Sequence, residues 1–197
     1  MNPILIEFPD RIETERLYIR PCLPGDGNVV LEAIEHSLED LQPWLPFAQC
    51  IQSLVDVEAN IRESYAEFIK RKDFRLHIFR KSDHVFIGST GLHRINWETK
   101  VFEIGYWLDR RQTKKGYITE AVEGLTDFAY NKLYAERIEI RCDPNNFNSR
   151  KVAERLGFTL EGILRNNARS ADGKSIRSTC VFSMLKNEWK QKAEASK

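Results

Sequence analysis

The sequence predicts an α+β fold built on a mostly antiparallel sheet, and three observations support this class. Strand-like runs at 74–80, 85–95 and 101–108 follow one another with only short polar turns between them, which favours an antiparallel meander. Segments with apolar residues at helical spacing lie before and after these strands. No repeat, low-complexity block or linker interrupts this order, so we expect a single domain over residues 1–197.

Composition limits the classes of function. Hydrophobic residues make up 42% of the 197-residue chain and charged residues 30%, as expected of a globular protein with its own core. The formal net charge is only +1, so no global field attracts nucleic acid or an anionic membrane. The apolar run within 1–15 is too short for a signal peptide, and no run approaches a membrane span. We therefore expect a cytoplasmic protein with no membrane partner and no direct nucleic-acid partner.

The cysteines give no sign of a metal site or a disulfide framework. The four of them are widely dispersed and form neither a CxxC pair nor a Cys/His cluster with ligand spacing: Cys22, Cys50, Cys142 and Cys180. We expect no metal in this protein.

The first half of the chain begins with an alternating strand, LYIRP, at 17–21. A glycine-containing turn then leads into a helix from about 29 to 36. The next segment, 41–49, is aromatic and interrupted by prolines, which exclude a regular helix or a central strand. A long amphipathic helix is predicted over 53–72.

The second half alternates helices and strands. The predicted elements are a helix over 116–130, a strand over 137–141, a helix over 149–158 capped by Asn148 or Ser149, strands over 159–166 and 176–185, and a C-terminal helix from 186. An Asp172-Gly173 turn joins the last two strands. The tail is expected to fray from about residue 190.

The stretch 105–121, GYWLDRRQTKKGYITEA, carries the strongest functional signal. A strand passes through a turn at Gly116 into the N-terminus of a helix, whose free N–H groups and positive dipole end favour a bound anion. Four cations crowd this turn and suit a polyphosphate: Arg110, Arg111, Lys114 and Lys115. By itself, the turn fits a phosphate site and a basic surface loop equally well.

The order of elements and several motifs together resemble the GNAT superfamily of acetyl-CoA-dependent N-acetyltransferases, most closely its RimJ/RimL type, which acetylates ribosomal proteins. The motifs are TERLYIRP, LQPWLPFA, IGSTGLHRI, EIGYWL, GYITEA and NSRKVAERLGFTLEG, and they cover nearly the whole chain. The resemblance implies a mixed, mostly antiparallel central sheet flanked by helices, with strands that splay at the cofactor site. It also implies acetyl-CoA as cosubstrate and a homodimer.

The resemblance implies a pyrophosphate loop at 111–116, where the family pattern is Gln/Arg-x-x-Gly-x-Gly/Ala. Lys114 replaces the first glycine and so departs from this pattern, which puts the fine geometry of the loop in question because glycine alone adopts positive φ without cost. Backbone N–H groups of 113–118 are expected to hold the pyrophosphate. The cofactor contacts implied on the loop and helix are Arg111, Gln112, Thr113, Lys114, Lys115, Gly116, Tyr117, Ile118 and Thr119.

Two further segments are implied to contact the cofactor arm. The strand before the loop contributes Tyr106, Trp107 and Leu108, although Trp107 alone would be interpreted as a packed aromatic. Asn146 and Ser149 match the family's Asn-x-x-Ser pattern, in which the amide contacts the arm and the hydroxyl lies near the thiol. Helix capping is the alternative interpretation of Ser149.

Two catalytic groups of relatives are absent from this chain. Ala153 stands where several relatives place a tyrosine acid, and Ala168 lies near the position of a glutamate base in RimL-type enzymes. Ser149 is therefore the candidate partner of the departing thiolate, and Glu103 the candidate base acting through water, with a structural hydrogen bond as the alternative for Glu103. Three residues are expected at the acceptor cleft, with plain packing as the alternative: Trp44, Phe47 and His93.

The basicity of amines bears on the acceptor. A terminal α-amine has a pKa of about 7.7–8.0 and a lysine side chain one of about 10.4, so far more of the α-amine is neutral at pH 7. A site with a weak or remote base suits the α-amine. We therefore expect acetyl transfer to a protein N-terminus by direct attack in a ternary complex. A small-molecule amine acetyltransferase and a non-catalytic acyl-CoA-binding module are the alternatives.

Overall fold

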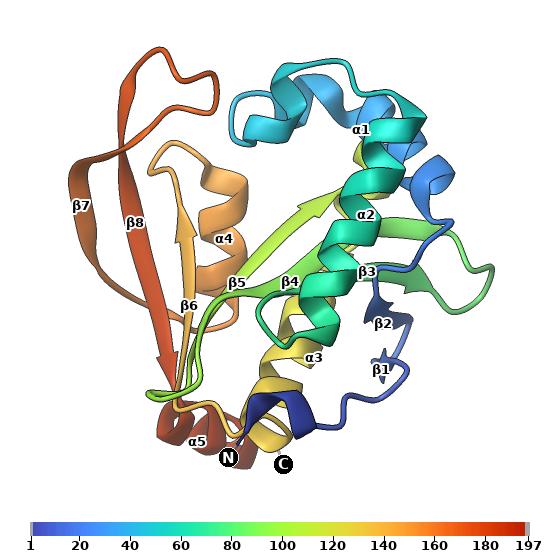
Figure 1. The fold of residues 1–197 in the computed structure, drawn as a ribbon. Coiled ribbons are helices and arrows are strands. Elements are labelled where there is room, and N and C mark those ends of the chain that lie inside the picture. Colours follow the sequence, from blue (N-terminus) through green and yellow to red (C-terminus); the bar gives the residue numbers. More distant parts are fainter. Residues whose placement is uncertain (1, 196–197) are drawn as a thin grey trace.

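The computed structural model describes residues 2–195, which contain one eight-stranded sheet with helices on both faces (Figure 1). The strands are β1 Ile12–Glu13, β2 Leu17–Pro21, β3 Phe74–Arg80, β4 Phe86–Asn96, β5 Val101–Leu108, β6 Arg137–Cys142, β7 Thr159–Arg169 and β8 Ile176–Leu185. Their order across the sheet is β1-β2-β3-β4-β5-β6-β8-β7. Every neighbouring pair is antiparallel except β5 and β6, which are parallel. The predicted α+β class with a mostly antiparallel sheet is confirmed.

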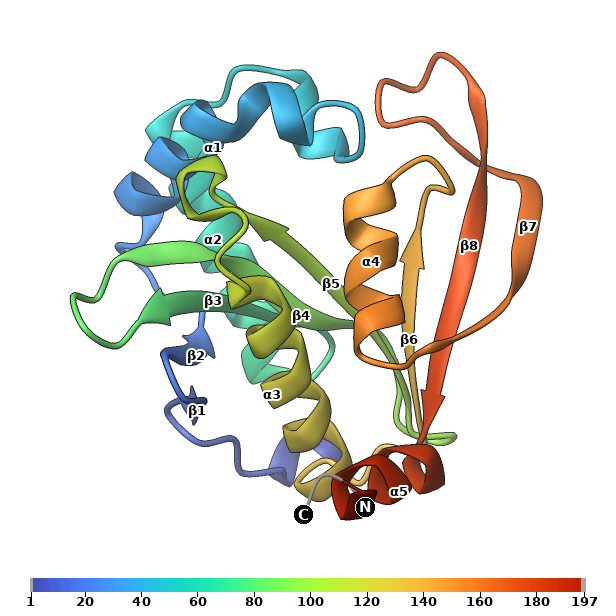
Figure 2. The same ribbon diagram turned by 180° about the vertical axis from the view of Figure 1, so that it is seen from behind.

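The helices lie on two faces of the sheet. They are α1 Gly27–Leu41, α2 Leu54–Ile69, α3 Tyr117–Asn131, α4 Phe147–Arg155 and α5 Lys186–Ala195, with short 3-10 helices η1 Pro3–Leu5, η2 Pro46–Gln49 and η3 Arg110–Gln112. Helices α1 and α2 cover one face, and α3 and α4 cover the other, which Figure 2 shows from behind. Within residues 2–195, no helix combines the length and the hydrophobicity that crossing a membrane requires.

Local hydrogen bonds explain where helices begin. Helix α2 begins as predicted after Ser53, which forms a reciprocal capping box with Asp56. Helix α4 begins at Phe147, and its N-cap is Asn146, whose amide oxygen accepts the N–H of Ser149 at 3.0 Å. The predicted caps for this helix, two or three residues later, are therefore wrong, because the asparagine at the end of the preceding turn already fills that position.

Several predicted helix ends differ from the structure. Helix α2 ends at Ile69 rather than 72, and α4 covers 147–155 rather than 149–158. Helix α1 continues five residues beyond the predicted end at 36, because Ser37 and Leu41 lie on its buried face and prolines follow only from 43 onward. Helix α5 is still helical at 190–195, past the expected fraying point, and its Trp189 packs in the core at 8% exposure. The last two residues of the predicted tail, 196–197, lie outside the described residues.

Strands β5 and β6 separate in the middle of the sheet. They pair over only three residues, Val101–Glu103 with Arg137–Glu139. Beyond Glu103, β5 stays paired with β4 as far as Leu108, while β6 pairs with β8. One side of β5 is thus left without a strand partner, and the predicted splay is confirmed.

Two apolar clusters fix the separated strand in place. On the α3 side, Phe102 and Ile104 of β5 are fully buried together with Leu125 of α3. On the α1 and α2 side, Trp107 packs against a second cluster that includes Phe86. Because apolar contacts hold both faces of β5, the strand delivers the loop that follows it at a defined position.

Candidate active site

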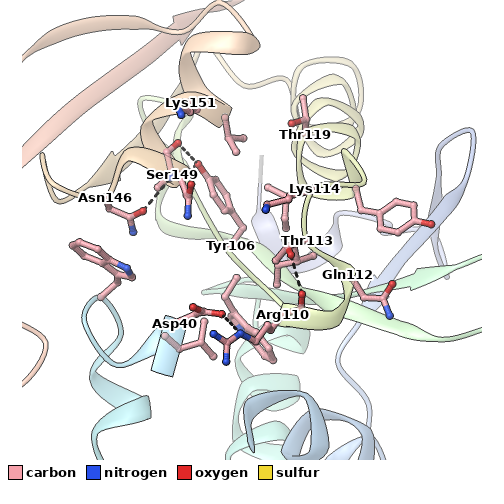
Figure 3. A pocket seen from close by; sticks show the side chains of 18 of the residues that line it. Asp40, Tyr106, Arg110, Gln112, Thr113, Lys114, Thr119, Asn146, Ser149 and Lys151 are labelled. Carbon is pink, nitrogen blue, oxygen red and sulfur yellow. Dashed lines mark hydrogen bonds and ion pairs between the residues drawn. The ribbon is translucent and has the colours of Figure 1, made fainter. Parts of the chain in front are cut away.

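A cavity of about 920 Å³ opens beside the unpaired part of β5, between the N-terminal end of α3 and helix α4 (Figure 3). Most of the predicted cofactor residues line it: Tyr106, Trp107, Leu108, Gln112, Thr113, Lys114, Gly116, Tyr117, Ile118, Thr119, Asn146 and Ser149. Arg111 and Lys115 of the same prediction are not among its lining residues. Three separate segments of the sequence therefore converge on one cavity.

The loop before α3 takes the left-handed backbone conformation twice. Gly116 has φ +81°, and Lys114 has φ +62° although it carries a side chain. The loop thus keeps a glycine-type geometry at the position where the family pattern has glycine and this chain has lysine, at a conformational cost. No side chain within the described residues caps α3, so the N–H groups of its first turn are open to an anionic ligand.

Arg111 and Lys115 brace the loop from outside the cavity. The Arg111 guanidinium binds the buried carboxylate of Asp109 at 2.7 Å and Glu32 of α1 at 2.6 Å, and these acids raise the pKa of Arg111. The ammonium of Lys115 donates to Arg111 O and to Gln112 Oε1, both at 3.0 Å. Both cations thus stabilise the conformation of the loop in this structure.

A second brace ties the N-terminal segment to the start of α3. The Arg16 side chain donates to the carbonyl of Lys115 at 3.0 Å and pairs with Glu120 at 2.7 Å. The same Glu120 carboxylate accepts the hydroxyl of Thr14 at 2.6 Å. These bonds join residues about a hundred positions apart, which is why sequence patterns did not reveal them.

Helix α4 supplies positive charge that the sequence interpretation missed. Lys151 and Arg155 line the cavity from α4, and the Arg155 guanidinium lies 3.3 Å from the hydroxyl of Thr119. Lys151 and Arg155 are four residues apart and so share a helix face. This spacing, just after Ser149, is the sequence pattern that could have predicted both as residues of the site. With Lys114 across the cavity, these cations favour a polyanionic ligand.

The other end of the cavity is acidic and aromatic. Glu39 and Asp40, at the end of α1, line it beside Trp44. Arg110 lies between the two acids, with its guanidinium 3.1 Å from Glu39 and 3.0 Å from Asp40. The charge of Arg110 is therefore offset by carboxylates, and the other cations that line the cavity are Lys114 of the loop and Lys151 and Arg155 of α4.

The predicted acceptor residues are only partly brought together. Trp44 lines the cavity. Phe47 does not line it, but its ring centroid is 6.0 Å from that of the lining residue Trp107. His93 is not among the lining residues, and its imidazole Nδ1 lies 2.8 Å from the carboxylate of Asp73. The loop wall is therefore present, and the histidine belongs to a separate pair on the sheet.

Glu103 also lies outside the lining of the cavity. Its carboxylate is half-buried, 3.1 Å from the guanidinium of Arg94 and 3.6 Å from that of Arg141. Burial raises the pKa of Glu103, against the opposing effect of the two arginines. It pairs in register with His93 on the neighbouring strand. A carboxylate with a raised pKa is suited to accept a proton, but Glu103 does not line the cavity.

The hydroxyl groups of Tyr106 and Ser149 meet at the α4 wall. Figure 3 shows Tyr106 rising from β5 toward Ser149. The oxygen atoms are 3.1 Å apart, and the Tyr106 hydroxyl also lies 3.0 Å from the backbone carbonyl of Ser149. Within residues 2–195, no three His, Cys, Asp or Glu side chains converge as metal ligands. The Tyr106 and Ser149 hydroxyls and the Asn146 amide all line the cavity.

This fold and cavity define a domain of the acetyltransferase type. The family model described as an acetyltransferase (GNAT) domain matches residues 16–159. The chain belongs to the GNAT acetyltransferase family.

Two relatives illustrate this membership, and one solved structure shows the same fold. The uncharacterized N-acetyltransferase p20 of Bacillus licheniformis is 38% identical over 112 residues, 57% of this chain and 61% of p20. The chain thus spans about three fifths of the length of that relative. The ribosomal-protein-serine acetyltransferase of Escherichia coli (strain K12) is 32% identical over 125 residues, 64% of this chain and 69% of that protein. The structure of RimL, a ribosomal L7/L12 α-N-protein acetyltransferase in complex with CoA, superposes with a TM-score of 0.83 at 20% identity, covering 90% of this chain and 99% of RimL.

Proposed function

We propose that the protein transfers an acetyl group from acetyl-CoA to the N-terminal α-amine of a protein, such as a ribosomal protein. The observation that carries the proposal is the cavity where β5 leaves β6, bordered by the uncapped N-terminus of α3 and its left-handed loop. Membership of the GNAT family supports the activity, and the names of the E. coli relative and of RimL support the acceptor.

In the proposed complex the cofactor has its pyrophosphate at the loop before α3 and its thiol end at α4. Its pyrophosphate would lie on the N–H groups of 113–118, with the cations of the loop and α4 around it. The pantetheine arm would run along the unpaired side of β5, where it can form the backbone hydrogen bonds that a neighbouring strand forms elsewhere. That path ends at Asn146 and Ser149, at the N-terminus of α4.

The acceptor assignment rests on the weakness of the available base. Glu103 acts through water, with burial raising the pKa of its carboxylate and so its basicity. Such a base serves an amine that is already partly neutral, and an α-amine with a pKa of about 7.7–8.0 meets this condition better than a lysine at about 10.4. The amine attacks the thioester carbonyl directly, and the thiolate leaves on the Ser149 side.

The experiment is a mass-spectrometric screen of acceptors with acetyl-CoA, combined with calorimetric measurement of CoA binding. Peptides with a free N-terminus and no lysine are expected to be acetylated faster than N-terminally blocked peptides that contain lysine. Faster acetylation of the lysine peptides would overturn the acceptor. Tight CoA binding without turnover on any amine would instead support a regulatory acyl-CoA module.

Glu103→Gln tests the base. We expect kcat to fall at least about tenfold, since a positioned base contributes roughly 10²–10⁴ in rate, with little change in CoA affinity. Glu98→Gln is the matched control, because that carboxylate lies exposed in the turn between β4 and β5. Equal activity of both variants would remove Glu103 from the mechanism.

A small-molecule amine is the second candidate acceptor, and one observation favours it. Glu39 and Asp40 place two carboxylates at the acceptor end of the cavity, where they suit a cationic amine. Their pairing with Arg110 offsets much of this charge, which is why the protein N-terminus ranks first. Polyamines, amino acids and aminoglycosides in the same screen decide between the two classes.

A further inference from the structure

The Tyr106–Ser149 contact joins two segments of the chain across the cavity. Tyr106 belongs to the unpaired part of β5, and Ser149 to the first turn of α4, 43 residues later. Both residues line the cavity, and the contact is drawn in Figure 3. The bond therefore lies at the point where the path of the cofactor arm ends.

The protons of this pair can be counted. Each hydroxyl has one proton. Tyr106 donates its proton to the backbone carbonyl of Ser149 at 3.0 Å, and either hydroxyl can be the donor across the 3.1 Å contact between Tyr106 and Ser149 Oγ. When the Tyr106 proton turns from the carbonyl to the Oγ of Ser149, the proton of Ser149 is free to point elsewhere. The Cys142 thiol is a further neighbour of this hydroxyl, and burial raises its pKa to about 11, so it stays neutral.

Tyr106 is also a stable donor. Burial raises the pKa of its phenol above the ordinary value, so the hydroxyl remains protonated throughout the neutral range. Ala153, fully buried on α4, carries no group that competes for this role. Chained hydroxyls polarise one another in a low-dielectric site, which strengthens the outer donor.

We propose that Tyr106 is a positioning residue for acetyl transfer: its hydroxyl proton turns from the Ser149 carbonyl to Ser149 Oγ, directs the Ser149 proton at the thioester sulfur, and replaces that proton as the thiolate leaves. This proposal rests on the proposed function. In the step, the amine nitrogen bonds to the carbonyl carbon, the C–S bond breaks, and its electron pair goes to sulfur. The sulfur takes the Ser149 proton and Ser149 takes that of Tyr106. The amine gives its proton through water to Glu103, from which it passes through water to Tyr106.

A double-mutant cycle on acetyl transfer tests the relay. Tyr106→Phe keeps the ring and removes only the hydroxyl, and we expect kcat to fall about 10- to 100-fold while KM for acetyl-CoA stays within about twofold. The kcat of Ser149→Ala should fall at least as far, and the kcat of the double variant should be no lower than that of Ser149→Ala. An unchanged kcat in Tyr106→Phe, or losses that simply multiply in the double variant, would overturn the proposal.

Tyr130→Phe is the matched control. The Tyr130 hydroxyl is buried as well, and it donates to the carbonyl of Met184 at 2.6 Å, away from the cavity. This variant should lower the melting temperature and leave kcat unchanged. A similar loss of kcat in Tyr130→Phe would assign the effect of Tyr106→Phe to general loosening and contradict the relay.

A second measurement needs no acceptor amine. With CoA bound, ionisation of its thiol can be followed by thiolate absorbance against pH. The relay stabilises the thiolate, so Tyr106→Phe and Ser149→Ala should each move the midpoint to higher pH, and the double variant should match Ser149→Ala. An unmoved midpoint in Tyr106→Phe would refute the relay even if acetylation occurs. A wild-type protein that binds CoA and shows the shift but acetylates no amine would refute the proposed function alone.

Discussion

Replacing Lys114 by glycine separates the conformational cost of the loop before α3 from its charge. Lys114 has φ +62°, where a residue with a Cβ pays about 1–2 kcal/mol, whereas glycine pays about 0.5–1 kcal/mol in chain entropy. The difference predicts that Lys114→Gly gains about 0–1.5 kcal/mol in the free energy of unfolding. For a chain of this length, that corresponds to a rise in Tm of roughly 0–6 °C.

The same change should weaken CoA binding. Lys114 lines the cavity with an exposed ammonium, and an exposed charge pair is worth up to about 1 kcal/mol. Loss of that ammonium predicts a Kd about two- to fivefold weaker, with the difference shrinking at high salt. Thermal melts of the free protein and calorimetry with CoA at two salt concentrations measure the two effects separately.

Two further variants complete this prediction. Lys114→Ala keeps the free-energy cost of the left-handed backbone conformation and loses the charge. Its affinity for CoA should therefore match that of Lys114→Gly, without the gain in Tm. Lys114→Arg should resemble the wild type in both. The reasoning is refuted if Lys114→Gly melts clearly below the wild type, or if it binds CoA more tightly than the wild type does.

Two predictions concern stability. Burial lowers the pKa of His77 to about 4, so the unfolded chain binds a proton more readily than the folded chain below about pH 6.5. The free energy of unfolding should fall by about 3 kcal/mol between pH 6.5 and 4. Urea titrations should show a flatter pH profile for His77→Gln, and an equally steep profile in this variant would contradict the argument. Ser53→Ala removes the capping box of α2 and should cost about 1 kcal/mol in thermal or urea denaturation, whereas Ser53→Thr keeps the cap; equal melting of the two variants would contradict the capping argument.

The elements themselves were largely readable from the sequence. Periodicity and turn residues located six of the eight strands within a residue or two, and Ser53 marked the start of α2. The strand at 159–166 was placed correctly but runs on to Arg169. The two-residue strand β1 was missed, because so short a segment has no periodicity and exists through its pairing with β2.

The cavity was harder to predict in detail because its groups act across large separations. The loop and the Asn-x-x-Ser turn were found from motifs, and both line the cavity. Composition did not indicate the ion pairs near them, in which Arg110 and Arg111 contact acids of α1. The contact between Tyr106 and Ser149 depends on the residue at which β5 separates from β6, and no local sequence pattern predicts that position.

The three-residue pairing between β5 and β6 also has a consequence for motion. It divides the sheet into two parts, β1 to β5 and β6 with β8 and β7, which share few direct backbone hydrogen bonds. A seam of this kind opens at lower free energy than the continuous ladders on either side. A ligand lying along it would replace missing strand-to-strand bonds and couple the two parts. Amide exchange on both sides of the seam should then slow when the cavity is filled, including in β6, none of whose residues lines the cavity.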